Sequence, residues 1–366
     1  MTRKLAFIML YLIMLFLFSF SYENGDFTVC DSESNYSINY DYQASKLIVG
    51  CCKPCSEVLI VDPNTLEITK EFAISGNMKE ALFINNGIDL LLLMSATDND
   101  TRTEEGKLIK LNYNTEQIVD ELLFDNWPQD MVVDNNESYC YVVSGLTGER
   151  KAKLHKVRLS DLMIVDTVDN QEGSDDIEIT PNGLKLYSNN TESHPTAEGT
   201  GFAGLDYCWH VNVYNTNDLS LITYIEILEN EPCLKMGNNN KLYITNPCPL
   251  FEEDWVLYVV DTLTDAIIQR KTFDNIGLWQ IGMSVPNNTL YMTTWLDNLW
   301  DFDYLQYVHQ PSNTVIAIDL SDYSYQLINM GLESLHGIAV ANINGIDRIF
   351  CTSEVSAKIF YKDIEQ

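Results

Sequence analysis

The stretch Ile177-Glu-Ile-Thr-Pro-Asn-Gly-Leu-Lys-Leu-Tyr187 decides the fold of this chain, because its pattern returns along most of the sequence. Apolar and polar residues alternate on both sides of the Pro-Asn-Gly segment, and that period of two predicts a β-hairpin joined by a tight turn. Comparable phrases with Asn-rich or Gly-containing turns begin at Leu82, Met131, Leu234 and Met283. The chain is therefore built from repeats.

A second hairpin pattern follows the first, as in Val211-Asn-Val-Tyr-Asn-Thr-Asn-Asp-Leu-Ser-Leu221. The residues that begin its turn are equivalent from copy to copy and recur at intervals of 43 to 58 residues: Asp62, Asn112, Arg158, Asn215, Asp261, Asp319 and Lys362. Four short strands repeated seven times, with no helical pattern between them, predict an all-β, seven-bladed β-propeller of four-stranded antiparallel blades.

The two ends of the chain predict how this ring closes. The seventh copy stops after its third strand, whereas Asp26-Phe-Thr-Val-Cys30 is a spare strand ahead of the first blade. An open strand edge is a liability that proteins usually cover. We therefore expect the N-terminal strand to complete the last blade.

The repeat phrase of an apolar strand, a Pro-Asn-Gly-like turn and a strand carrying Leu-Tyr resembles the YVTN repeat of the YncE-like propellers, which are exported and cell-surface proteins of bacteria and archaea. The resemblance covers nearly the whole chain after residue 21. The words Tyr-Val-Thr-Asn never occur, and Leu242-Tyr-Ile-Thr-Asn is the nearest match. The resemblance implies the blade architecture and says little about activity, because fold does not fix function.

Residues 1–21 have the pattern of a secretory signal peptide, with basic Arg3 and Lys4, the apolar run from Leu5 to Phe20, and small residues near a cleavage point. The run has 16 residues, fewer than the roughly 20 of a membrane-spanning helix, and an uncleaved anchor is the alternative. We expect residues 22–366 to form a single propeller domain that is periplasmic, on the cell surface or secreted, and not integral to the membrane once the signal is removed.

The charge balance excludes one class of partner. The chain has 22 Lys plus Arg against 53 Asp plus Glu, a formal net charge of −31. Nucleic-acid binding depends on clustered cationic side chains that displace counterions from phosphates. We therefore expect no nucleic-acid partner.

Nine cysteines in an exported chain favour disulfides, with metal or redox chemistry as the alternative for the cluster Cys51-Cys52-Lys53-Pro54-Cys55. Ser56 stands where c-type haem attachment requires His, which excludes that cofactor. Cys233 and Cys248 flank one predicted hairpin and are expected to pair. Cys140 and Cys351 lie on predicted second strands and are expected to be buried free thiols.

Long insertions are predicted between the second and third strands of blades four and six, on the face that also carries the connections between blades. Binding residues concentrate on such loops. The candidate ligand-binding residues on this face are Trp127, Asp175, His210, Trp279, Trp295, Trp300, His309 and His336. The segment Trp295–Tyr304 is either an aromatic platform for a carbohydrate or peptide or an insertion whose rings pack inward.

The hairpin alignment also predicts which residues ring the central axis on that face. A group of acids and one imidazole could hold a divalent cation, either Ca²⁺ or a transition metal: Glu80, Asp130, Asp175, Asp176 and His336. The alternative is that these acids are solvated loop residues in a chain that is acidic throughout.

No Gly-x-Ser-x-Gly elbow, Gly-rich phosphate loop or His-x-x-Glu zinc motif occurs. The sequence therefore favours an exported, non-catalytic binding or scaffold module for a protein or glycan. One alternative is a metal-dependent hydrolase or lactonase, whose cation at the mouth of the axis would polarise a substrate carbonyl. Another is a propeller subunit of a larger exported redox complex.

Overall fold

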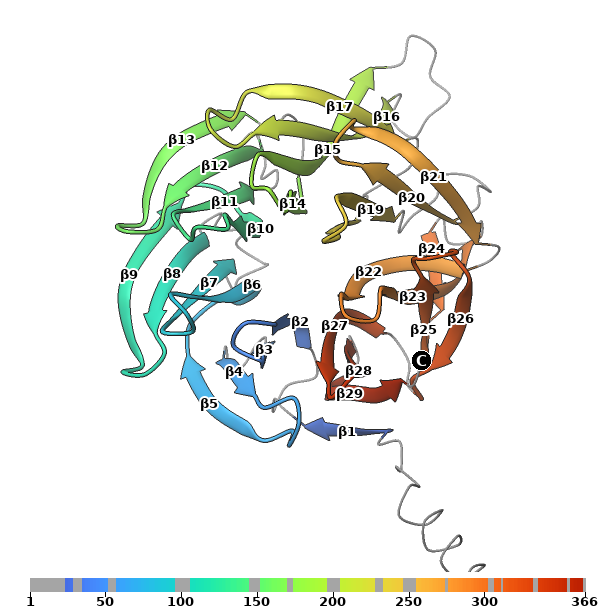
Figure 1. Cartoon of the computed structure of the whole chain (residues 1–366), viewed down its shortest axis with the longest axis horizontal. Coiled ribbons are helices and arrows are strands. Elements are labelled where there is room, and N and C mark those ends of the chain that lie inside the picture. Colours follow the sequence, from blue (N-terminus) through green and yellow to red (C-terminus); the bar gives the residue numbers. More distant parts are fainter. Residues whose placement is uncertain are drawn as a thin grey trace, which may run out of the picture.

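The chain forms a ring of seven antiparallel sheets around a central axis, seen end-on in the computed structural model of Figure 1. The structure describes residues 24–28, 35–51, 57–95, 106–144, 152–169, 174–195, 205–227, 233–245, 255–273, 276–301, 306–310, 312–331, 335–353 and 356–364. No helix is present among these residues. The all-β, seven-bladed propeller predicted from the repeats is confirmed.

The first three blades follow one another in chain order, each from its innermost to its outermost strand. Blade 1 consists of β2 (Asn35–Asp41), β3 (Lys46–Cys51), β4 (Glu57–Val61) and β5 (Ile68–Ala73). Blade 2 consists of β6 (Asn77–Ile84), β7 (Asp89–Ser95), β8 (Gly106–Asn112) and β9 (Gln117–Phe124). Blade 3 consists of β10 (Pro128–Val133), β11 (Tyr139–Ser144), β12 (Lys153–Arg158) and β13 (Met163–Asp169).

The next three blades repeat this order. Blade 4 consists of β14 (Ile177–Ile179), β15 (Lys185–Pro195), β16 (Leu205–Asn215) and β17 (Leu221–Ile227). Blade 5 consists of β18 (Cys233–Met236), β19 (Lys241–Thr245), β20 (Trp255–Asp261) and β21 (Ala266–Phe273). Blade 6 consists of β22 (Ile276–Ser284), β23 (Thr289–Asp301), β25 (Thr314–Asp319) and β26 (Tyr325–Asn329), with β24 (Gln306–Gln310) paired to the far end of β23.

Blade 7 closes the ring by joining the two ends of the chain. It consists of β27 (Leu335–Ile343), β28 (Ile346–Ser353), β29 (Ser356–Ile364) and, outermost, β1 (Asn24–Thr28). The antiparallel pairing places Asn24 opposite Lys362 and Thr28 opposite Lys358. The N-terminal strand therefore covers an edge that β29 would otherwise leave open, as predicted, although it begins at Asn24 instead of Asp26.

The turn after the third strand has the same construction in most blades. In blade 1 the side-chain oxygen of Asp62 accepts a hydrogen bond from the Asn64 N–H (2.8 Å), and Leu66 has a positive φ. Asn112, Asn215, Asp261 and Asp319 accept the same bond from the residue two positions on. An Asp or Asn that bonds its own backbone in this way favours the turn, which explains why these residue types recur there.

Cationic side chains tie each of several blades to this turn in the next blade. In five cases a Lys or Arg donates to the carbonyl of the residue directly after Asp62 or its equivalent in the turn: Lys70 to Tyr113, Lys110 to Leu159, Lys156 to Thr216, Lys185 to Thr262, and Arg348 to Pro63. These bonds help to satisfy the carbonyls of the turns. Five of the 22 Lys and Arg side chains of this acidic chain are thus used between blades.

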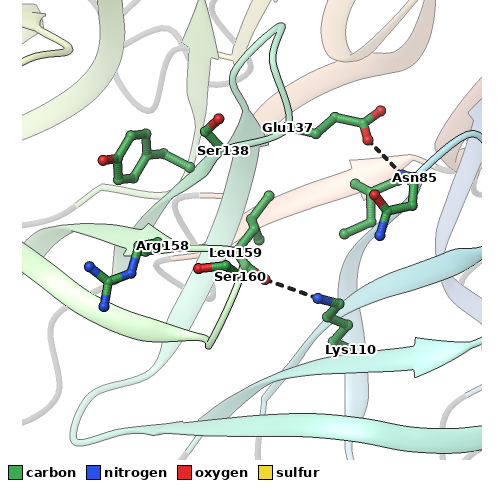
Figure 2. Close-up of a pocket in the computed structure, with 9 residues that line it drawn as sticks. Asn85, Lys110, Glu137, Ser138, Arg158, Leu159 and Ser160 are labelled. Atoms are coloured by element: carbon green, nitrogen blue, oxygen red, sulfur yellow. Dashed lines mark hydrogen bonds between the residues drawn. The ribbon is translucent and has the colours of Figure 1, made fainter.

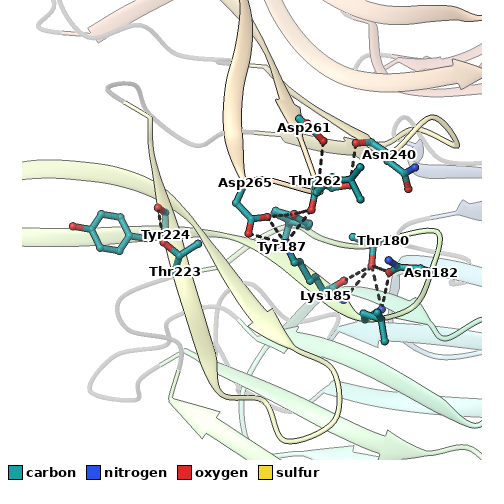
Figure 3. A network of polar contacts seen from close by, with 12 residues as sticks. Thr180, Asn182, Lys185, Tyr187, Thr223, Tyr224, Asn240, Asp261, Thr262 and Asp265 are labelled. Carbon is teal, nitrogen blue, oxygen red and sulfur yellow. Dashed lines mark hydrogen bonds and ion pairs between the residues drawn. The ribbon is translucent and has the colours of Figure 1, made fainter.

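Figure 3 shows this contact between blades 4 and 5. Lys185 forms an ion pair with Asp265 (2.7 Å), whose other carboxylate oxygen accepts a hydrogen bond from the Tyr187 hydroxyl (2.5 Å). Tyr187, Tyr243 and Tyr291 are fully buried at equivalent positions of blades 4, 5 and 6. The Leu-Tyr of the repeat therefore fills the space between blades with a ring whose hydroxyl reaches a polar partner.

The cysteine predictions have different outcomes. Cys140 and Cys351 are free and fully buried, as expected, and burial raises the pKa of both thiols. Cys52, Cys55 and Cys248 lie outside the described residues, so the predicted disulfides stay predictions. The same holds for the signal segment, residues 1–21. In the described part of the chain, no helix is long and apolar enough to cross a membrane.

Candidate functional site

The two faces of the ring are built differently. The turn face carries the short turns after the first and third strands of each blade, and all of these turns in blades 1–6 are described. The loop face carries the connections after the second strands and those between blades, most of which fall outside the described ranges. The sequence placed the candidate binding residues on the loop face.

The innermost strands of five blades are irregular at the same level near the loop face. The register between the first two strands shifts around Tyr36, Lys79, Gln129, Trp279 with Gln280, and His336 with Gly337. A β-bulge redirects side chains and is frequent beside functional sites. The bulges therefore form a ring of residues around the loop-face end of the axis, which we call the mouth.

One cation–π contact and one aromatic pair lie at the mouth. The Lys79 ammonium lies 5.3 Å from the centre of the Trp127 ring, and the Trp127 indole nitrogen is buried without a hydrogen-bond partner among the described residues. The rings of Trp279 and His336 are 5.8 Å apart. Asp175 is exposed just ahead of β14. Four of the predicted binding residues are thus at the mouth, contributed by blades 3, 4, 6 and 7.

The remaining predicted binding residues are placed elsewhere or not described. His210 is part of β16 and not of a loop; it is 9% exposed, and its ring packs 5.4 Å from that of Tyr224 on β17. Its position is therefore within blade 4, because β15 and β16 extend farther than the alternation of the sequence indicated. Trp295 and Trp300 belong to β23 and His309 to β24, but their side chains lie outside the described set.

Acidic side chains gather on the inner strands just below the mouth, and we call Glu80, Asp130, Asp176 and Glu178 the axial acidic cluster. Asp130 accepts the backbone N–H of Ile177 (2.9 Å), and Asp176 accepts that of Leu234 (2.7 Å). Each carboxylate thus bonds the innermost strand of the following blade. The cluster therefore holds blades 3, 4 and 5 together in addition to carrying charge.

Mutual repulsion and loss of water shift the pKa values of this cluster upward. Burial, with smaller contributions from Glu178 and Asp176, raises the pKa of Glu80 from 4.5 to about 8. Burial also raises the pKa values of Asp130 and Asp176, and the charge of each carboxylate opposes the ionisation of its neighbours. Carboxyl groups of this kind are partly protonated at neutral pH.

Lys235 on β18 is the cation of the cluster. Its ammonium lies 2.9 Å from a carboxylate oxygen of Glu178, and the attraction of Glu178, Glu80 and Asp176 raises the pKa of Lys235. Lys235 thus pairs with Glu178. The raised pKa values of Glu80, Asp130 and Asp176 mean that a cation brought close to them would favour their ionised forms.

The predicted cation site was tested against the same geometry. Within the described ranges, no group of three or more His, Cys, Asp or Glu side chains is arranged to hold a metal ion. Glu80, Asp130 and Asp176 come from blades 2, 3 and 4, whereas His336 comes from blade 7. The binding of a divalent cation by this chain therefore stays a prediction.

Two members of the cluster were not predicted from the sequence. Glu178 and Lys235 occupy equivalent places on the innermost strands of blades 4 and 5, opposite Tyr187 and Tyr243 on the second strands. The Leu-Tyr phrase of the repeat could have located both residues, since it fixes the register of each hairpin. Reading the partners of each Tyr would have revealed this acid and base pair.

Comparisons with known proteins support the fold and do not identify a family. No known protein family matches the sequence, and no curated protein does. The structure is similar to the Cps50 (Swd1) β-propeller domain of Myceliophteria thermophila, with a TM-score of 0.68, 11% identity, and coverage of 94% of this chain and 100% of that one. It is also similar to the hydrazine synthase of Kuenenia stuttgartiensis, with a TM-score of 0.66, 12% identity, and coverage of 92% and 97%.

Proposed function

We propose that this chain is an exported, non-catalytic binding module that takes a protein or glycan partner at the mouth. The observation that carries the proposal is the ring of β-bulges, which places Lys79, Gln129, Trp279 and His336 at register shifts of the innermost strands near the loop face. A rigid ring of blades that presents varied side chains at one end is the usual arrangement of a binding propeller. The signal-peptide pattern of residues 1–21 supports the exported location.

Charge narrows the class of partner. The axial acidic cluster lies beneath the mouth, Asp175 is exposed beside it, and the chain as a whole carries a formal net charge of −31. A partner that presents Lys, Arg or another cationic group would pair with Asp175 and favour the ionised forms of the carboxyls below it. The indole of Trp127 and the ring of Trp279 provide aromatic surface for the uncharged part of such a partner.

Capture experiments test this proposal. The purified chain, immobilised at pH 7, is exposed to a glycan array and to exported proteins of its native host. Asp175→Lys reverses a charge at the mouth and is expected to reduce capture at least about tenfold, because it repels a cationic group. Glu71→Lys, an exposed charge reversal on outer strand β5, is the matched control and should leave capture unchanged. Equal capture by all three proteins would contradict the proposal.

The hydrolase alternative makes a different demand, because its chemistry requires a bound cation. Elemental analysis of the purified protein measures that cation directly. A stoichiometric metal that is lost in Asp130→Asn would favour the enzyme over the binding module. Sequencing the N-terminus of the protein from its host tests export, with a mature start near Tyr22 expected.

A further inference from the structure

The interface between blades 2 and 3 differs from the interface between blades 3 and 4 at the position of one tyrosine. Between blades 3 and 4, the Tyr141 hydroxyl (3.1 Å) and the Lys156 ammonium (2.8 Å) both donate to the Thr216 carbonyl. Tyr141 and Lys156 face each other across β11 and β12. Their rings and charges fill that interface, where Lys156 is 8% exposed.

Blade 2 has the same lysine but lacks the tyrosine. Lys110 donates to the Leu159 carbonyl (3.0 Å), which is the equivalent of Thr216. The residue facing Lys110 across β7 and β8 is Leu91. Among the described contacts, no tyrosine hydroxyl donates to the Leu159 carbonyl, and Lys110 is its side-chain donor.

The turn of blade 3 departs from the repeat as well. Arg158 occupies the position at which Asp62, Asn112, Asn215, Asp261 and Asp319 cap their turns. The guanidinium is held by two bonds from Nε and Nη2 to the Asp161 carboxylate (2.9 and 2.7 Å). Its remaining nitrogen, Nη1, forms no hydrogen bond within the described part of the chain. A cation thus replaces an acid or amide in a chain that is otherwise poor in cations.

A cavity of about 410 Å³ lies where these two departures meet, on the turn face between blades 2 and 3 (Figure 2). Lys110 and Arg158 stand on different sides of it, with Ser138 and Ser160 between them and Tyr139 and Leu159 in its wall. This volume is in the range of pockets that bind small molecules.

Donors outnumber acceptors among the side chains of the cavity. Lys110 uses one of its three N–H groups on the Leu159 carbonyl, and the hydroxyls of Ser138 and Ser160 have no partner among the described contacts. The single carboxylate in the wall, Glu137, already accepts the Asn85 N–H (2.6 Å). Surplus N–H and O–H groups beside two cations are the complement of an oxyanion, since a carboxylate or phosphate only accepts hydrogen bonds.

We propose that this cavity is a binding site for a small organic oxyanion, a carboxylate or a phosphate ester, held between Lys110 and Arg158. The site lies on the turn face, opposite the mouth, and does not depend on the partner proposed there. Tyr139 and Leu159 contact the uncharged part of the ligand. Arg158 remains paired with Asp161 through Nε and Nη2, which leaves Nη1 for the ligand.

Thermal melts at fixed ionic strength test the site, with inorganic phosphate and glutarate as separate probes and chloride as the reference anion. A ligand that binds only the folded chain raises the melting temperature in proportion to its affinity. Arg158→Asn restores the capping residue of the other turns, so its fold is supported. It is expected to raise the half-saturating concentration of the bound anion at least about tenfold, the loss of one charge-assisted contact.

Leu91→Tyr places the phenol of the neighbouring interface against the Leu159 carbonyl and is expected to abolish the response. Lys271→Gln on outer strand β21 removes a cation far from the cavity and should respond as the unmodified chain does. A response to phosphate alone or to glutarate alone identifies which oxyanion class is bound. No response to either probe, or equal responses in the unmodified chain and in both cavity variants, would overturn the proposal.

Discussion

The turn face and the mouth are built from the same repeat, but the residues at equivalent positions are similar on the turn face and different at the mouth. On the turn face, equivalent positions hold equivalent residues, and cations are bonded to carbonyls or carboxylates of the next blade, as Lys185 is to Asp265. Below the mouth, equivalent positions differ from blade to blade: Asn39, Leu82, Val132, Glu178 and Lys235 all stand opposite the second strand at one level. The similar residues of the turn face hold the blades together, whereas the residues at the mouth differ from blade to blade.

The difference shows how an acidic repeat protein can remain closed. Each blade contributes hydrogen bonds to its neighbour on the turn face, whereas the axial acidic cluster concentrates like charges that must take up protons to coexist. The blade 2–3 interface, with Leu91 and Arg158, is the place where the turn face itself departs from the repeat. On both faces, the positions at which a blade differs from the repeat therefore mark the candidate binding sites.

The largest effect is expected from removing β1. Deletion of residues 24–28 exposes the edge of β29 and opens the contact between the two ends of the ring. We expect the melting temperature to fall by at least about 5–10 °C, as for a loss of several kcal/mol. Deletion of residues 1–21 alone is the control and should leave the melting temperature of the remaining chain unchanged. An unaltered melt after loss of β1 would show that closure does not stabilise the ring.

The second prediction concerns the pH dependence of stability, which we expect to come from the axial acidic cluster and not from the turn face. Because the pKa of Glu80 is raised from 4.5 to about 8 by burial, the folded state binds more protons than the unfolded state between these values. Stability is therefore expected to decrease as the pH rises from about 4.5 to about 8. Melts across this range measure it.

Glu80→Gln supplies the matched variant for the pH experiment. It removes the titrating group, so the slope of melting temperature against pH should become shallower and the protein should be more stable at pH 8. A slope that is unchanged in Glu80→Gln would place the titration elsewhere.

The blades and their closing strand could be predicted from the sequence, whereas part of the candidate site could not. Period-two alternation and the Asp or Asn turns were enough to predict seven blades and the N-terminal closing strand, because both are local patterns that repeat. The pairing of Glu178 with Lys235 was missed because it joins two neighbouring blades, whereas the repeat pattern predicts pairing only within a blade. His210 was misplaced because strands β15 and β16 continue into a segment whose sequence does not alternate clearly.

A third, smaller effect tests the tyrosines between blades. Tyr187→Phe removes the hydroxyl that donates to Asp265 (2.5 Å) and should lower the free energy of unfolding by about 1–2 kcal/mol. Chemical denaturation measures the change. Tyr224→Phe is the matched control, because Tyr224 is 54% exposed on an outer strand, and it should be neutral. Equal effects of the two variants would mean that the inter-blade bond contributes nothing.

The smallest expected effect is the difference in stability between a variant in a turn and a variant at the mouth. Asp62→Ala removes the acceptor of the Asn64 N–H and should cost about 0.5–1.5 kcal/mol. Asp175→Asn, at the exposed edge of the mouth, should stay within about 0.5 kcal/mol of the unmodified chain. The reverse order would mean that the mouth and not the turn face holds the ring together.

The central claim is that the mouth is the binding face, and site-specific photo-crosslinking in the native host tests it most directly. One protein carries the crosslinking amino acid at Asp175 beside the mouth, and another carries it at Leu263, which is 69% exposed on the turn face. The account predicts a discrete crosslinked partner from position 175 and none from position 263. A partner crosslinked only from position 263 would contradict it.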